Sequence, residues 1–167
     1  VTDVSVHEQY ACATHSGALK CWGYYADPSS ITPKINSSPV AVTSMVDSYS
    51  KVAAGGAYTC AKTATAWTCF GVPIESTNNV MAAPYGIFYE PRDIDFDISS
   101  FTSIAIGNTL SCGIKSDNSV FCWGYNPFFT GSFYWDTPVD IGVKFKSFST
   151  KINGICGINL TDQLVCG

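Results

Sequence analysis

Eight cysteines are the most conspicuous reactive groups of this 167-residue chain. They fall into four pairs that flank short polar turns, with eight or nine residues inside each pair. No C-x-x-C step or Cys/His cluster is present, so the spacing does not fit a zinc site. An even and regular set predicts disulfides, and therefore an oxidising, extracellular location. The eight are Cys12, Cys21, Cys60, Cys69, Cys112, Cys122, Cys156 and Cys166.

The pairing of these cysteines follows from their repetition. Four equivalent segments favour four local bridges over any bridge between segments. Opposed residues of a non-hydrogen-bonded antiparallel pair lie about 4.5 Å apart at Cα, within reach of a disulfide. The first pair is symmetric about a Ser16-Gly17 turn, whereas pairs with nine intervening residues need a three-residue turn or a bulge. Each bridge closes a loop of about ten residues and contributes roughly 2–3 kcal/mol.

General acid–base chemistry has few candidates. The chain has two histidines, His7 and His15, and neither lies in a motif with a nucleophile or an orienting carboxylate. His15 is next to a turn, where an exposed polar residue is unremarkable. We therefore predict no catalytic residue, no cofactor and no enzymatic activity, with a hydrolase as the least favoured function.

Three alternating carboxylates, Asp93, Asp95 and Asp97, could form a calcium site, because hard cations take carboxylate oxygens. An EF-hand loop starting at Asp93 would require glycine in place of Ile98 and glutamate in place of Ile104. A strand with its carboxylates in water explains the alternation better. These aspartates remain weak metal candidates, and no metal is predicted.

Aromatic side chains crowd the segment that begins at Trp123. Trp123 occupies a repeated position and is expected to fill the core. The others lie in a stretch punctuated by glycine and proline, where both core filling and contact with a partner protein or carbohydrate are open. The candidate binding residues are Tyr125, Phe128, Phe129, Phe133, Tyr134 and Trp135.

Four repeated hairpins must position these groups. The first cysteines of successive pairs are 48, 52 and 44 residues apart, which indicates an internal repeat. Val, Ile, Tyr, Phe and Trp alternate with small and polar residues on both sides of each turn, as in half-buried strands. A strand led by Pro39, Pro91 or Pro138 is expected before each following hairpin. The sequence predicts an all-β, single repeat domain over residues 1–167, with hairpins near residues 4–23, 52–71, 104–124 and 148–167.

Composition excludes two classes of partner. The formal charge is −4 and the nine Lys and Arg residues are scattered singly, so no cationic stripe for nucleic acid exists. No apolar run approaches the roughly 20 residues of a membrane span. Two sequons, Asn36-Ser37-Ser38 and Asn159-Leu160-Thr161, predict a secreted glycoprotein, although Pro39 weakens the first.

The repeated pattern resembles the regulator-of-chromosome-condensation repeat family, especially the cysteine-bearing extracellular version of crinkly-type plant receptor ectodomains. The resemblance implies a β-propeller of four-stranded blades, typically seven in a ring. It covers the whole chain. The residues that carry it are Ala54-Gly55-Gly56-Ala57-Tyr58-Thr59-Cys60-Ala61, Gly17 with Cys21-Trp22-Gly23, and Cys122-Trp123-Gly124-Tyr125-Asn126.

This sequence departs from the family pattern after Asn126, where Pro127-Phe128-Phe129 replaces the usual Gly-Gln-Leu-Gly step. The nucleotide-exchange activity of the founding member belongs to a nuclear protein that docks on a GTPase and chromatin, whereas this chain is acidic and is predicted to be secreted, so that activity does not transfer. The length corresponds to about three and a half to four blades. A fragment of a larger propeller, neighbouring chains that complete one another, and a compact four-bladed ring are all open.

The predicted function is a secreted, non-enzymatic interaction or structural module. Its partners would be an extracellular protein or other copies of itself. The first copy opens with Val4 and Val6 in a bare strand and the last closes with Leu164 and Val165, so we expect free blade faces that join head to tail. A carbohydrate-binding propeller and an inhibitor of another extracellular protein are the alternatives.

Overall fold

The computed structural model describes most of the chain, and the regular structure in these parts is antiparallel β-strand. Those parts are residues 1–25, 34–42, 45, 48–56, 58–71, 88–92, 98–125, 134–151 and 154–167. They contain fourteen strands and no helix, which confirms the all-β prediction. The strands form three sheets. The chain divides into two units, Val1–Pro73 with Tyr85–Asp95, and Ile74–Pro84 with Phe96–Gly167, and each is described by itself.

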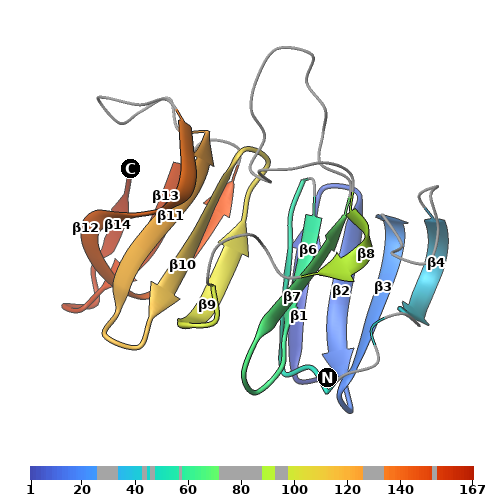
Figure 1. The fold of residues 1–167 in the computed structure, drawn as a ribbon. Helices are drawn as coiled ribbons and strands as arrows, with labels where there is room; N and C mark the ends of the chain where they lie inside the picture. The colour runs from blue at the N-terminus through green and yellow to red at the C-terminus, as the bar shows by residue number, and fades with distance from the viewer. Residues whose placement is uncertain are drawn as a thin grey trace. The chain divides into compact units, whose positions relative to one another are not determined.

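The first unit holds two four-stranded sheets in which the strands follow chain order (Figure 1). Each sheet is one propeller-type blade of the predicted kind, with its middle two strands forming the cysteine hairpin. The first blade consists of β1 (Asp3–His7), β2 (Tyr10–His15), β3 (Ala18–Tyr25) and β4 (Lys34–Ala41). The second consists of β5 (Lys51–Ala54), β6 (Tyr58–Lys62), β7 (Trp67–Gly71) and β8 (Phe88–Arg92).

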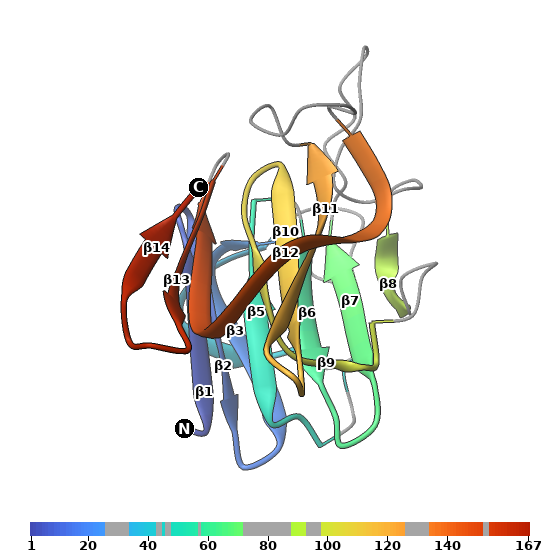
Figure 2. The same ribbon diagram turned by 90° about the vertical axis from the view of Figure 1, so that its left-hand side faces the viewer.

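The second unit holds one six-stranded sheet in which two blades share a strand. The strand β12 pairs with β11 through its first part and with β13 through its last part. It runs as a single long ribbon from one blade into the next (Figure 2). The strands are β9 (Phe101–Ile106), β10 (Leu110–Lys115), β11 (Ser119–Tyr125), β12 (Tyr134–Lys151), β13 (Gly154–Asn159) and β14 (Leu164–Cys166).

The segment before each first cysteine contains two strands, where the sequence suggested one. In the first repeat, β1 and β2 are separated by Glu8 and Gln9, which carry no glycine or proline signal. In the second repeat, Gly55 and Gly56 precede β6. The cysteine hairpins are therefore the inner part of three- and four-stranded units.

All four disulfides join the second and third strands of one repeat, which confirms the predicted pairing. The two Cα atoms of each bridge are 4.0 or 4.1 Å apart, as expected for opposed residues of a non-hydrogen-bonded pair. The bridges are Cys12–Cys21, Cys60–Cys69, Cys112–Cys122 and Cys156–Cys166.

The hairpin turns also follow the predicted lengths. Ser16 and Gly17 form a two-residue turn with φ of +51° and +81°, the signs that a type I′ hairpin requires. The third and fourth hairpins have three-residue turns, which end on Asn118 and Asp162 with φ of +67° and +63°. Asn and Asp tolerate this left-handed conformation better than other non-glycine residues.

The repeated aromatic-glycine step is a β-bulge. The register between the third and fourth strands shifts between Cys21 and Gly23, and it shifts at the corresponding places in the next two blades. Gly23 has φ of +90°, and a Cβ atom there would lie 2.4 Å from the carbonyl oxygen of Gln9. Only glycine fits this position, which explains why the step ends in glycine.

The outer strands differ from the prediction. Pro39 lies near the end of β4, Pro91 is the penultimate residue of β8, and Pro138 lies inside β12, so none of them leads its strand. Both β4 and β8 are outermost strands of their sheets, where a missing N–H leaves no ladder bond unmade.

Candidate interaction surfaces

The residues considered for catalysis and metal binding do not form a site in the described structure. His7 is in β1 with its ring 6.2 Å from that of Tyr10, and His15 ends β2 with Nδ1 3.2 Å from the amino terminus. Within the described ranges, no group of three or more His, Cys, Asp or Glu side chains is placed to hold a metal. Asp93, Asp95 and Asp97 lie outside those ranges.

The predicted aromatic binding residues are only partly described. Trp123 is buried and stacks on Phe101 at 5.8 Å between ring centroids, in agreement with the expected core role. Trp135 is half-buried and packs against the core of the second unit. Tyr125 and Tyr134 face each other in the β11–β12 ladder, and their side chains are outside the description. Phe128, Phe129 and Phe133 lie outside the described residues altogether.

The contact between the two blades of the first unit shows how such blades bind each other. The strand β5 packs against β1 and β2. The carboxylate of Asp3 accepts a hydrogen bond from the N–H of Val52 at 2.9 Å, and the hydroxyl of Ser5 accepts one from the N–H of Ala54 at 2.9 Å. Side chains of one blade thereby satisfy backbone donors at the free edge of the next, donors that would otherwise cost free energy.

Tyr10 adds a second polar contact between these blades. Its hydroxyl donates to the carbonyl of Gly55 at 2.8 Å and accepts from the N–H of Gly55 at 3.1 Å. The hydroxyl of Thr59 lies 2.8 Å away. Burial raises the pKa of Tyr10 to about 12, and the hydrogen bonds with Thr59 and Gly55 oppose part of that rise. Tyr10 is therefore held in its neutral form in this contact.

An apolar core surrounds the polar contacts. The disulfide Cys12–Cys21 lies in it with both cysteines fully buried. The second blade covers this disulfide with Val52, Ala61 and Phe70. The first blade thus presents a disulfide and hydroxyl or carboxylate groups, and the second presents small apolar side chains and backbone N–H groups.

On the opposite side of the first blade, two valines of β1 are exposed. Val4 and Val6 are 54% and 73% exposed, whereas Val52 and Ala54, which occupy the same register positions in the second blade, are 6% and 5% exposed. We call this side of the blade the head face. It comprises the exposed Val4 and Val6, the half-buried Lys20 and Trp22, and the buried Ala11 and Ala13.

The last blade is exposed on the side that corresponds, in the first blade, to the side facing the second blade. Leu164 is 70% exposed, while Leu19 at the same hairpin position of the first blade is 1% exposed. Cys156 and Cys166 are also exposed, in contrast to the buried Cys12 and Cys21. We call this side the tail face. It comprises Ser147, Ser149, Cys156, Leu164 and Cys166.

The sequence indicated the apolar part of these faces but not the polar part. Val4, Val6 and Leu164 are recognisable in the sequence as apolar residues of the first and last strands. Asp3 and Ser5 are ordinary polar residues of a strand until the structure shows that they reach the edge of the next blade. The positions of Asp3 and Ser5 relative to the first cysteine of the repeat are the signal that could have identified the corresponding residues of the other repeats.

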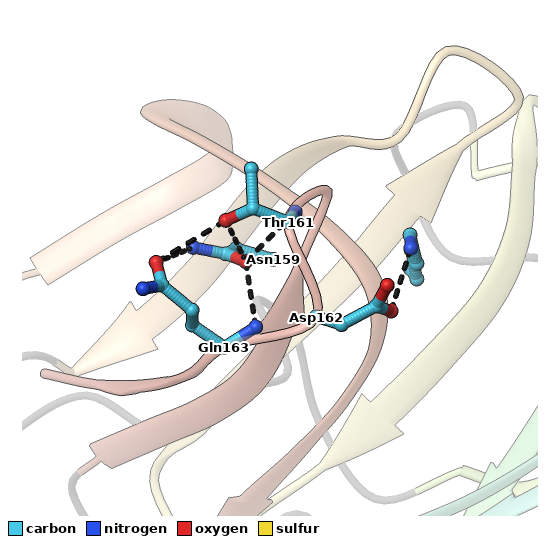
Figure 3. A network of polar contacts seen from close by, with 5 residues as sticks. Asn159, Thr161, Asp162 and Gln163 are labelled. Carbon is cyan, nitrogen blue, oxygen red and sulfur yellow. Dashed lines mark hydrogen bonds and ion pairs between the residues drawn. The ribbon is translucent and has the colours of Figure 1, made fainter.

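The second sequon forms a closed polar network at the tip of the β13–β14 hairpin (Figure 3). The side-chain carbonyl of Asn159 accepts hydrogen bonds from the N–H and the hydroxyl of Thr161 at 3.0 and 2.8 Å, and from the N–H of Gln163 at 2.9 Å. Leu160 and Thr161 are exposed. In the first sequon, Asn36 lies inside β4 and its side-chain amide donates to the hydroxyl of the buried Tyr25 at 3.1 Å.

Comparisons with known proteins agree with this architecture. Residues 101–129 match the family model of the regulator of chromosome condensation (RCC1) repeat. No curated protein matches the sequence. No helix in the described ranges is long and apolar enough to cross a membrane.

Several solved structures share the fold. The chain superposes on human WBSCR16 with a TM-score of 0.75 and 16% identity, over 98% of this chain and 46% of that one. It superposes on yeast RCC1 (Prp20), solved in a complex with Kap60, with a TM-score of 0.72 and 16% identity, over 98% and 42%. The CRINKLY ectodomain of the Arabidopsis thaliana receptor kinase ACR4 gives a TM-score of 0.54 and 21% identity, over 98% and 48%. The chain thus shares the fold of RCC1-type propeller blades, and it spans less than half the length of these proteins.

Proposed function

We propose that this chain is a secreted, non-enzymatic interaction module that binds protein through the exposed faces of its blades. The observation that carries the proposal is the head face. Val4 and Val6 are largely exposed on a surface whose counterpart in the second blade is buried against a neighbouring blade. Exposed apolar groups in a surface built for packing are typical of protein–protein interfaces.

Extracellular location is supported by the four disulfides, since such bridges persist in oxidising compartments. The sequon at the exposed hairpin tip is compatible with a secretory route. The fold shared with a receptor ectodomain supports the same location. Yeast RCC1, with the same fold, was solved bound to a protein, Kap60.

The test is affinity capture with the immobilised chain from the extracellular fluid of its native source. Val6→Lys places a charge on the edge strand of the head face, and Ile35→Lys places the same charge on an equally exposed β-branched residue of β4. We expect the wild-type chain and I35K to retain the same protein, and V6K to lose it. Retention of no protein, or a hydrolytic activity abolished by His15→Ala or Asp95→Asn, would refute the proposed function.

A further inference from the structure

The tail face exposes a disulfide whose counterpart in the first blade is buried. Both Cys156 and Cys166 are exposed, and Ser149 lies directly opposite Cys156 in the ladder. In the first blade, Ser5 lies directly opposite Cys12, and that whole row is turned toward the second blade. The tail face therefore has the side-chain arrangement of a surface that receives another blade.

The register makes this correspondence specific. Ser149 and Ser5 each pair with the first cysteine of their repeat, and Ser147 and Asp3 each lie two residues earlier. Asp3 and Ser5 are the two side chains that accept hydrogen bonds from the N–H groups of β5. Ser147 and Ser149 carry hydroxyl acceptors at the same two positions, and both are exposed.

The head face supplies the matching donors. Cys12 and Cys21 form a closely spaced, non-hydrogen-bonded pair, so the backbone polar groups of Cys12 point toward Ser5 on β1. Successive N–H groups of a strand alternate between its two edges, and those of Val4 and Val6 therefore point to the free edge of β1. Val4 and Val6 hold the register positions of Val52 and Ala54, which donate to Asp3 and Ser5.

We propose that the head face of one copy binds the tail face of a second copy of this chain. In the joint, the N–H groups of Val4 and Val6 donate to the hydroxyls of Ser147 and Ser149 of the second copy, and Val4 covers its exposed disulfide. This assignment rests on the proposed function and names the partner. A second copy is favoured because this chain itself carries both halves of the contact, and the contact continues the interface already present within the first unit.

The joint is expected to be weaker than the internal contact. Gly154 stands two residues before Cys156, where the first blade has Tyr10 two residues before Cys12. The joint therefore lacks the hydroxyl that binds Gly55 and Thr59 within the first unit. Association should be reversible and should depend on concentration. Because head and tail differ, the contact is heterologous, and a dimer retains one free head face on one copy and one free tail face on the other.

Sedimentation velocity over a concentration series, with the full chain, tests the joint. Wild-type protein should form dimers and larger species as concentration rises. Val6→Lys or Ser149→Lys should each weaken self-association at least tenfold, and the matched surface variant Ile35→Lys should behave as wild type. Circular dichroism and disulfide mapping establish that each variant is folded.

A mixture of V6K and S149K gives the decisive measurement. Each variant alone has no complete joint, but the head of S149K and the tail of V6K are both intact. We therefore expect the mixture to form a 1:1 complex that does not grow further. Wild-type protein that stays monomeric, or folded V6K that associates as wild type does, would overturn this inference. If that occurs while affinity capture still retains another protein, the proposed function stands and only the identity of the partner is wrong.

Discussion

At the scale of single residues, Tyr10 links the protonation of one hydroxyl to the packing of two blades. Its pKa is raised to about 12 by burial, and its hydroxyl donates a hydrogen bond to the carbonyl of Gly55 in the second blade. An unfolded tyrosine has a pKa near 10. The raised pKa favours the folded state while the hydroxyl is neutral, a contribution that is complete below about pH 10 and is lost as pH rises toward about 12.

We predict that alkaline conditions destabilise the wild-type protein more than Tyr10→Phe. The extra loss for wild type relative to pH 8 should be about 2 kcal/mol at pH 11.5 and should approach about 3 kcal/mol above pH 12, the equivalent of a shift of about two pKa units. At pH 8, Y10F should itself cost about 1–2 kcal/mol, because Gly55 and Thr59 lose a hydrogen-bonding partner. Denaturant unfolding at pH 8, 10 and 11.5 measures both effects, with the exposed Tyr24→Phe as control. Parallel pH profiles for wild type and Y10F would contradict the assignment.

The two sequons make a second prediction at this scale. Both asparagine amides donate a hydrogen bond to a side chain, but Asn159, which donates to Gln163, is at an exposed hairpin tip, whereas Asn36, which donates to Tyr25, is inside a strand. A glycan is bulky and needs a surface position. Expressed in a eukaryotic secretory host, the chain should carry a glycan on Asn159 and none on Asn36. Mass spectrometry should show loss of the glycan in Asn159→Gln and Thr161→Ala and no change in Asn36→Gln, and a glycopeptide containing Asn36 would disprove the distinction.

At the scale of elements, the third and fourth repeats pack a phenylalanine ring against a glycine next to the disulfide. Gly113 and Gly157 each follow the first cysteine of a pair, and in each case a phenylalanine ring lies over the glycine. A Cβ atom on Gly113 would approach Phe101 to 2.7 Å, and one on Gly157 would approach Phe145 to 2.4 Å. In the first repeat the same position holds Ala13. The ring and the missing side chain together fill the space.

Gly113→Ala should therefore destabilise the protein by about 1–3 kcal/mol through overpacking. Phe101→Leu should also destabilise it, through lost apolar burial. The double variant should be more stable than the sum of the two single effects predicts, since the smaller leucine makes room for the new methyl group. A double-mutant cycle from thermal unfolding gives this coupling. Additive effects would mean that the ring and the glycine do not share the space.

How much of the structure the sequence predicts depends on how local the cause is. The cysteine hairpins follow from turn residues and spacing, and their pairing and turn lengths are confirmed. The two-strand nature of the upstream segment is not evident at Glu8 and Gln9, which lack a turn signal. The shared strand β12 depends on pairing with two different partners, so no single window of sequence contains its cause.

The candidate surface follows the same division. Val4, Val6 and Leu164 are recognisable from the sequence as apolar residues of its first and last strands. The roles of Asp3 and Ser5 depend on how one blade sits on the next. The corresponding residues of other repeats can be predicted only after one contact between two blades is known.

At the scale of the whole molecule, the repeats differ in what covers their disulfides. Cys12, Cys21, Cys60 and Cys112 are fully buried, whereas Cys156 and Cys166 are exposed. Thiol–disulfide exchange requires that a thiolate reach a sulfur atom. The disulfide of the fourth repeat should therefore respond to reductant before the other three, although their local sequences are alike.

Under mild reduction at low protein concentration, Cys156 and Cys166 should become reactive first, and the other three pairs should react only when the chain unfolds. Alkylation followed by peptide mapping measures the order. At concentrations where head and tail faces join, the Cys156–Cys166 bridge should be protected, and Val6→Lys should remove that protection. Earlier labelling of Cys12 or Cys21 would show that burial does not control the reaction.

The shared strand β12 has a mechanical consequence. Its residues bond to β11 on one stretch and to β13 on the next, and Phe145 donates its N–H to Asn118 of the third hairpin while pairing with Asn159 of the fourth. A pulling force on the chain is therefore carried across the boundary between these two repeats by a strand that is hydrogen-bonded on both sides of it. Stretched from its ends, the second unit should rupture in one step, so that its two blades act as a single load-bearing element.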